Sequence, residues 1–343
     1  LDLDLPERKI VLDDKGKVAS VNFRDRLDAH RLIEEFMVLA NVAAAETLIK
    51  KRQPLLFRVH EEPAQDKLDA LRDTAQAAGL NLAKGQVLQT RHLNALLNAA
   101  AGTDDAELIN ISTLRSMQQA YYYPENFGHF GLALRNYAHF TSPIRRYADL
   151  IVHRALITAH GWGKDGLSAD EVERLEDTAT HISATERRSM LAERDTTDRY
   201  LASYLAERVG NEFTGRISGI ARFGAFVKLD ETGADGLVPV RSIGREYFHF
   251  DAQAGTLMGS DTGLIIAIGQ RVTVRLTQAA PVTGGLELEL LALEDAELPK
   301  GRGDAGKGGR RRSPAGRTVS RSKAAKSKHK AAKVKRKVTR KRK

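Results

Sequence analysis

Residues 139–156 read His-Phe-Thr-Ser-Pro-Ile-Arg-Arg-Tyr-Ala-Asp-Leu-Ile-Val-His-Arg-Ala-Leu. Ser142 and Pro143 predict a helix start, because a hydroxyl is a preferred N-cap and proline suits the first helical position. Arg145 and Arg146 then fall in the first turn, where open amide groups and the helix dipole attract anions. Two guanidinium groups there favour bidentate binding of phosphate oxygens. The stretch therefore predicts a helix end that binds a phosphodiester.

Asp149 lies four residues after Arg145 and four residues before His153. The first spacing predicts that the carboxylate holds the guanidinium of Arg145 on one helix face. The second spacing would also let Asp149 and His153 share a metal ion, but the arginines on that face favour bracing over metal binding. We expect no metal ligand in this stretch.

Composition limits the classes of protein to be considered. The chain has 343 residues, enough for two or three domains, and no cysteine. Disulfides and thiolate metal sites are thereby excluded, and a reducing, cytoplasmic location is expected. No apolar run reaches the roughly 18 residues of a membrane span, and no signal peptide opens the chain. Because it begins at Leu1 inside a strand-like segment, we expect a piece of a longer protein.

The positive charge is concentrated in one segment. Residues 300–343 hold 20 Lys and Arg against one acid, so the net charge of +10 leaves −9 for residues 1–299. The acidic body must contact nucleic acid through local patches, whereas the tail favours sequence-independent, salt-sensitive attraction to phosphate. The tail has no apolar periodicity from about residue 298 and is expected to be disordered.

The rest of the chain divides into a part with helical patterns and a part with short β-rich runs. After weak strands in residues 1–22, apolar spacing and glycine stops predict helices, and an aromatic, glycine-containing loop and strand fills 121–134. Ser168 and Glu171 form a capping box that opens a stretch of roughly 60 Å if unbroken. The helices are expected over 26–51, 64–79, 89–101, 103–119 and 168–208. After Gly210, short β-rich runs predict a small closed barrel, with strands in 211–218, 223–230, 236–240, 264–268, 271–277 and 286–291.

Four blocks of the chain carry a resemblance to a known family. They are Arg31-Leu-Ile-Glu-Glu-Phe-Met-Val-Leu-Ala-Asn41, Asn126-Phe-Gly-His-Phe-Gly-Leu-Ala-Leu134, Tyr137-Ala-His-Phe-Thr-Ser-Pro-Ile-Arg-Arg-Tyr147 and Met190-Leu-Ala-Glu-Arg-Asp195. In order and spacing they resemble the ribonuclease II (RNB) family of processive 3′→5′ exoribonucleases, whose S1-like barrel also follows at this place. The basic tail resembles one branch of that family more than the other.

The resemblance implies an α+β fold in four parts. The expected parts are a helix-rich C-terminal portion of an RNB catalytic domain in 1–160 and a long helical extension in 161–208. A five-stranded OB-fold (S1-like) barrel follows in 209–294, and a disordered basic tail in 295–343.

The resemblance also implies an activity and its cofactor. Family members hydrolyse single-stranded RNA to nucleoside 5′-monophosphates with two Mg²⁺ ions, held mainly by a D-x-D-D-A cluster. That pattern lies upstream of this segment in the family. The close acid pairs of this chain, Asp2/Asp4, Asp13/Asp14 and Asp104/Asp105, do not have it. We expect the fragment to bind RNA better than it cuts it and to hold no metal by itself.

The family motifs assign candidate roles in and near the catalytic centre. Arg145 matches the arginine that contacts the scissile phosphate, and Glu193 matches a glutamate that orients or tunes the catalytic groups. Arg146 is expected to position the RNA backbone. Glu34 or Glu35 matches a glutamate near the 3′-terminal nucleotide, with Glu34 slightly favoured; solvation of the helix is the alternative for both.

Further RNA contacts are expected from histidine and phenylalanine side chains. His129 and His139 are candidates for contact with phosphate or base, against a purely structural role. In the barrel, Phe223 and Phe226 fit positions on which S1-like domains stack bases, whereas Phe213 fits either stacking or filling of the barrel. Pro239 stands where the S1 pattern often has histidine, a loss for which Arg241 and His249 are candidate replacements.

The expected partner is single-stranded RNA, with the ribosome or other RNA-decay factors as candidate contacts of the tail. A monomer without membrane attachment is expected. The competing interpretation is a non-catalytic RNA- or ribosome-binding protein that keeps the nuclease scaffold.

Overall fold

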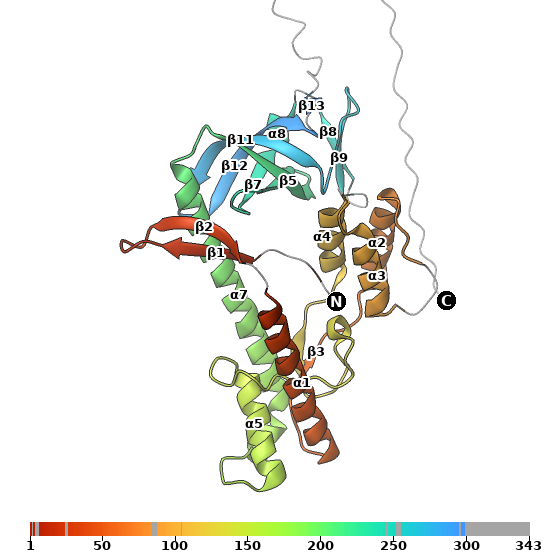
Figure 1. The fold of residues 1–343 in the computed structure, drawn as a ribbon, viewed down its shortest axis with the longest axis vertical. Coiled ribbons are helices and arrows are strands. Elements are labelled where there is room, and N and C mark those ends of the chain that lie inside the picture. Colours follow the sequence, from red (N-terminus) through yellow and green to blue (C-terminus); the bar gives the residue numbers. More distant parts are fainter. Residues whose placement is uncertain are drawn as a thin grey trace, which may run out of the picture. The chain divides into compact units, whose positions relative to one another are not determined.

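The computed structural model describes residues 1, 3, 7–24, 27–83, 88–103, 105–244, 246–251, 255–294 and 296–298 (Figure 1). The segment expected to be a disordered tail lies almost entirely outside the described residues. Asp2, Asp4 and Asp104, from two of the acid pairs named above, also lie outside them. An antiparallel hairpin of β1 (Glu7–Leu12) and β2 (Val18–Arg24) opens the described chain. In its turn, Asp13 accepts hydrogen bonds from the backbone N–H groups of Lys15 and Lys17.

The expected helices of the first part are present, each within three residues of its predicted ends. They are α1 (Asp28–Lys50), α2 (Gln65–Ala77), α3 (Thr90–Ala100) and α4 (Ala106–Ser116). Gly79 and Gly102 follow α2 and α3 with φ of 71° and 77°, the left-handed conformation that glycine adopts without strain. Among the described residues, no helix is both long enough and apolar enough to cross a membrane.

A two-stranded sheet lies between the helices and carries part of the site. β3 (Phe57–Val59) pairs antiparallel with β4 (Tyr121–Tyr123), and Arg58 lies opposite Tyr122 in this register. Phe57 and Val59 point into a core that includes residues of α1 and α5. Because side chains alternate along a strand, Arg58 points away from that core.

The helix expected to start at Ser142 starts later, which corrects that prediction. α5 spans Tyr147–His160, and Arg146 is its N-cap residue in an extended conformation, with φ of −126° and ψ of 119°. Residues 143–145 form a single turn in which the carbonyl of Ser142 accepts hydrogen bonds from the N–H groups of Arg145 and Arg146. The arginines therefore stand in the turn before the helix and not in its first turn.

The long helical stretch is also interrupted. The capping box is confirmed, because Ser168 Oγ accepts from Glu171 N–H and the Glu171 carboxylate accepts from Ser168 N–H. It opens only α6 (Ala169–Glu173), after which Arg174 breaks the helix at φ −97° and ψ 16°. α7 then runs over Leu175–Ala206, about 48 Å at 1.5 Å per residue. Its last turns enter the core of the following domain through Leu201 and Leu205.

The β-rich part is a closed five-stranded barrel, as predicted. Its strands are β5 (Glu212–Ala221), β6 (Gly224–Leu229), β7 (Asp235–Pro239), β11 (Arg271–Ala280) and β12 (Gly285–Leu293). The order β11-β5-β6-β7-β12 closes through pairing of β11 with β12, and β13 (Ala296–Glu297) extends β12. A short helix, α8 (Val240–Ile243), follows β7.

A second small sheet covers the barrel and was mostly missed by the sequence prediction, which placed one strand over 264–268. It consists of β8 (Phe248–Asp251), β9 (Thr256–Gly259) and β10 (Ile265–Ala267) in antiparallel order. Phe248, Leu257 and Ile266 enter the barrel core from it. The signal was weak because each strand is only three or four residues long.

Candidate functional site

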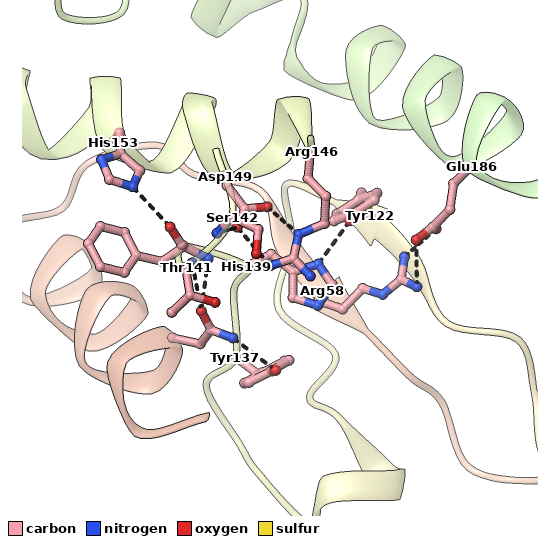
Figure 2. Close-up of polar contacts among 12 residues, drawn as sticks. Arg58, Tyr122, Tyr137, His139, Thr141, Ser142, Arg146, Asp149, His153 and Glu186 are labelled. Carbon is pink, nitrogen blue, oxygen red and sulfur yellow. Dashed lines mark hydrogen bonds and ion pairs between the residues drawn. The ribbon is translucent and has the colours of Figure 1, made fainter. Parts of the chain in front are cut away.

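Arg145, Arg146 and Glu193 line one cavity of about 470 Å³, so Glu193 is brought close to two arginines that are distant from it in sequence. Its walls come from β4, from the turn before α5 with the start of that helix, and from α7. The lining residues are Tyr122, Arg145, Arg146, Tyr147, Ala148, Ile182, Thr185, Glu186, Ser189, Met190 and Glu193. Figure 2 shows the polar contacts that support the Tyr122 and Arg146 side of this cavity.

Asp149 holds Arg146, which corrects the expected pairing with Arg145. Arg146 Nε donates to Asp149 Oδ2 and Nη2 donates to Oδ1, each at 2.8 Å (Figure 2). The Asp149 side chain is 0% exposed, and its Oδ1 also accepts from the Ser142 N–H at 2.7 Å. The extended backbone of Arg146 lets its side chain turn back to the helix, so the i,i+3 pair replaces the predicted i,i+4 pair.

Arg145 is exposed and remains available to a ligand. No hydrogen bond or ion pair joins its guanidinium group to another residue in the part of the chain that the structure describes. Its backbone is fixed by the Ser142 turn, while its side chain borders the cavity. A fixed backbone with an uncommitted cation is the arrangement that an anion-binding arginine requires.

The segment before the turn is held by Asn41 of α1. Its side-chain carbonyl accepts hydrogen bonds from the N–H groups of Phe140 and Thr141, at 2.9 and 3.2 Å. Its amide nitrogen donates to the Tyr137 hydroxyl at 3.0 Å. His153 Nε2 donates to the Phe140 carbonyl at 2.9 Å, so this ring nitrogen braces the segment. These contacts fix the backbone that carries both arginines.

Arg58, Tyr122 and Glu186 complete the site and were missed from the sequence. Arg58 Nη1 and Nη2 donate to the Glu186 carboxylate at 2.7 and 3.1 Å, and the guanidinium carbon lies 4.6 Å from the centre of the Tyr122 ring (Figure 2). One signal was available for Glu186. It lies seven residues, two helical turns, before Glu193, so both side chains share a face of α7.

His129 and His139 lie in a row of ring contacts. His139 Nδ1 lies 2.8 Å from the Tyr122 hydroxyl, and the His139 ring contacts Tyr137 edge-on. His129 is the N-cap residue of η1 (Phe130–Leu132), and its Nδ1 accepts from the Leu132 N–H. Its ring also contacts Tyr137 edge-on. Neither histidine lines the cavity that holds Arg145. Direct contact of these rings with RNA remains a prediction.

Burial keeps both histidines neutral. It lowers the pKa of His139 to about 3, and the charges of Arg146 and Arg58 act in the same direction. The pKa of His129 is also lowered to about 3, first by burial and then by the neighbouring ring of His60. Neutral imidazoles suit the contacts that these rings make within the fold.

Other predicted site residues lie elsewhere. Glu34 and Glu35 are on α1, half-buried and exposed respectively, and neither lines the cavity. On the barrel, Phe223 is 58% exposed and Phe226 is half-buried, with their ring centres 5.9 Å apart. Phe213 is 8% exposed and belongs to the barrel core, so it fills the barrel and does not offer its ring to a base.

The described residues do not provide a metal site. No group of three His, Asp or Glu side chains within the described ranges is arranged to hold an ion. The Asp149 and Glu186 carboxylates are each paired with an arginine, whereas Glu193, which also lines the cavity, has no such pair among the described residues. Mg²⁺ requires several oxygen ligands, so this donor set does not fit it by itself.

Family comparisons agree with the two halves of the described fold. The RNB domain family matches residues 1–160, and the S1 RNA binding domain family matches residues 207–290. The two matches follow each other in the same order as the helical first part and the barrel of the structure. Residues 1–160 are thus assigned to the RNB domain family, and an S1 domain follows them in residues 207–290.

Proteins similar to most of the chain include several ribonucleases R. The chain is 38% identical to ribonuclease R of Escherichia coli over 92% of this chain and 41% of that protein. It is 36% identical to ribonuclease R of Aquifex aeolicus over 85% of this chain and 41% of that protein. The chain spans about two fifths of the length of these relatives.

A solved structure supports the same assignment. Mycoplasma genitalium RNase R, in complex with ribose methylated single-stranded RNA, matches with a TM-score of 0.79 and 30% sequence identity. The match covers 84% of this chain and 46% of that chain.

Proposed function

We propose that this chain is part of a ribonuclease R that shortens single-stranded RNA from its 3′ end and releases nucleoside 5′-monophosphates by hydrolysis. The observation that carries the proposal is the exposed, uncommitted Arg145 at the rim of a cavity whose other arginine is held by Asp149. The RNB domain match of residues 1–160 and the similarity to ribonucleases R support the choice of reaction.

In this proposal Arg145 contacts the scissile phosphate. Its guanidinium group offers paired N–H donors to phosphate oxygens and stabilises the negative charge that develops during hydrolysis. The Asn41 contacts and the Arg146–Asp149 pair hold the backbone of the turn in place. Little ordering of the protein is then needed when the phosphate binds, which favours the transition state.

Arg146 and the carboxylates of α7 have supporting roles. Arg146 is a positioning residue that shapes the cavity wall and adds positive potential for the RNA backbone. Glu186 neutralises Arg58, so that Arg58 supports Tyr122 without competing for the phosphate. Glu193 lines the same cavity, and in this proposal it orients the reacting groups.

The Mg²⁺ ions expected of the family belong to the proposal for the whole protein. The described residues do not form their site. We infer that this chain alone binds RNA without shortening it. Its described residues supply an arginine for the phosphate but do not form a site for the metal ions.

The remaining parts hold the incoming strand in this proposal. Phe223 and Phe226 stack bases on the barrel, and the cations of residues 300–343 attract the RNA backbone. Glu34, His129 and His139 remain candidates for contact with RNA. A monomer that acts in the cytoplasm is proposed, with the tail as the contact for the ribosome or other RNA-decay factors.

The decisive experiment is digestion of a 5′-labelled single-stranded RNA by the full-length gene product, with and without Mg²⁺. A ladder that shortens from the 3′ end only in the presence of Mg²⁺ supports the proposal. RNA that is bound but never shortened would instead favour the non-catalytic RNA-binding protein. Arg145→Ala in the same full-length protein should abolish the ladder while RNA is still bound.

A further inference from the structure

A second cavity, also of about 470 Å³, lies on the barrel and is distinct from the cavity that holds Arg145. The turn between β5 and β6, helix α8 and strand β8 form its walls. Two arginines, Arg222 and Arg241, line it together with Tyr247 and His249. Cations and flat rings on one surface are the combination that single-stranded nucleic acid requires.

Strand geometry explains why the two rings face outward. Phe248 is 5% exposed and is inserted into the barrel core. Phe248 is the first residue of β8, and neighbouring side chains in extended chain point to opposite sides, so His249 and Tyr247, which directly precedes the strand, lie on the side away from the core. Tyr247 is 69% exposed, His249 is also exposed, and the two ring centres lie 4.8 Å apart with the rings edge-on.

The strand that carries these rings is fixed to its neighbours. The Glu246 carboxylate accepts hydrogen bonds from the N–H groups of Asp261 and Thr262, at 2.6 and 2.9 Å. Ser260 N–H donates to the Tyr247 carbonyl at 2.9 Å. The hydroxyl of Thr262 also donates to Glu246, and these bonds lower the pKa of that carboxyl. The negative charge of Glu246 is therefore committed to the turn between β9 and β10.

The two arginines are accessible to an anion. Arg222 is exposed in the turn between β5 and β6. The Arg241 side chain is 77% exposed, and its Nη2 lies 3.0 Å from Glu287 Oε1. An exposed ion pair of this kind contributes little free energy, so a phosphate group competes with it readily.

This cavity adjoins the aromatic pair already proposed to stack bases. Val240 lines the cavity, and its N–H donates to the carbonyl of Phe223 at 2.9 Å. Phe223 in turn contacts Phe226 edge-on. A strand of RNA that stacks on Phe223 therefore reaches the cavity with its next nucleotides.

We propose that the cavity is a nucleotide subsite for single-stranded RNA. Arg222 and Arg241 bind a backbone phosphate, and Tyr247 and His249 hold the adjoining base. The subsite rests on the proposed function, because it takes the barrel to be an RNA-binding surface. Since every base offers a flat face to an aromatic ring, the subsite is expected to accept all four bases.

The test compares barrel variants of the whole chain by fluorescence anisotropy with labelled oligouridylate, at about 0.3 M salt to screen the basic tail. The double variant Tyr247→Ala/His249→Ala should raise Kd by about 5- to 100-fold, the range that loss of base stacking produces. Tyr247→Phe keeps the ring and should bind like the wild-type chain. Thermal unfolding should be unchanged in both variants, because the altered side chains are exposed.

The arginines are tested by the salt dependence of Kd. Arg222→Gln and Arg241→Gln should each reduce the slope of log K against log salt by roughly 0.7, the loss of one phosphate contact on a single strand. Arg271→Gln is the matched control, because Arg271 is exposed on the barrel and does not line the cavity. Its slope should equal that of the wild-type chain.

The outcomes separate this inference from the function on which it rests. If Phe223→Ala weakens binding while Tyr247→Ala/His249→Ala binds normally, the subsite is wrong and RNA binding by the barrel stands. If the wild-type chain does not bind oligouridylate, both are wrong. An equal loss of slope in Arg271→Gln would mean that Arg222 and Arg241 act through general charge, which also overturns the subsite.

Discussion

The buried carboxylate of Asp149 accepts two hydrogen bonds from Arg146, and Arg145, one residue earlier, takes no part in this pair. Two neighbouring arginines of the same motif thus have different environments. Arg146 is half-buried and paired, whereas Arg145 is exposed at the cavity. This difference separates structural support from phosphate contact, and it makes the two residues experimentally distinguishable.

Replacement of the two arginines should affect stability to very different extents. Arg146→Ala leaves the Asp149 charge buried without its partner, so we expect the free energy of unfolding to fall by about 3 kcal/mol. Arg145→Ala removes an exposed side chain, so stability should change by less than about 0.5 kcal/mol. Urea unfolding of the two variants measures this contrast.

The same pair of variants in the full-length protein tests the catalytic assignment. With Arg145→Ala, turnover should fall by about 100-fold or more with a much smaller change in RNA affinity, as expected for loss of transition-state stabilisation. Equal losses of turnover and affinity would reduce Arg145 to a positioning residue. The control is Arg145→Lys, which keeps the charge but loses bidentate geometry and should recover only part of the rate.

Stability should fall as the pH decreases below about 6.5, because His139 and His129 are both buried as neutral rings. The pKa of His139 is lowered to about 3 in the fold by burial, compared with the usual histidine value of 6.5. Between these values the unfolded chain binds a proton that the folded chain does not, so stability is complete above about pH 6.5 and is lost toward pH 3. His129 contributes in the same way, so His139→Asn should remove only part of this dependence, as measured by thermal unfolding between pH 7 and pH 4.

A matched histidine provides the control for that measurement. His181→Asn alters an exposed residue of α7 and should leave the slope of stability against pH as in the wild-type chain. If His139→Asn and His181→Asn gave the same slope as the wild-type chain, burial of His139 would not contribute to the acid sensitivity.

The barrel phenylalanines should separate into two classes. Phe213→Ala removes a core side chain and should lower the free energy of unfolding by about 3–5 kcal/mol. Phe223→Ala removes an exposed ring, so it should leave stability nearly unchanged and weaken binding of single-stranded RNA by about 1–3 kcal/mol. Phe223→Tyr keeps an aromatic face and should retain affinity. Equal affinity of Phe223→Ala and the wild-type chain would remove this ring from the RNA surface.

Deletion of residues 300–343 should reduce the salt dependence of RNA binding. The segment contains 20 Lys and Arg, each a source of counterion release when it contacts phosphate. The chain 1–299 should bind more weakly at low salt and show a shallower slope of log K against log salt. An unchanged slope would show that the tail cations do not contact RNA.

The sequence by itself determined the periodic features of this protein. Apolar spacing in residues 26–51 and the capping box of Ser168 depend on contacts within a few residues, and both agree with the structure. Short runs between glycines likewise predicted the five-stranded barrel. The order of the motifs identified the family and brought Arg145 and Glu193 forward as site residues, and the fold places both at one cavity.

Only the tertiary structure determined which charged side chains of the site pair with each other. A spacing of four residues suggested that Asp149 holds Arg145, but Asn41 of a distant helix fixes the preceding segment, and the chain turns so that Arg146 meets the carboxylate instead. The pairing of Arg58 with Glu186 spans 128 residues and left no local signal. Local propensity fixes where helices and strands form, whereas the partner of a buried charge depends on the position of the surrounding chain.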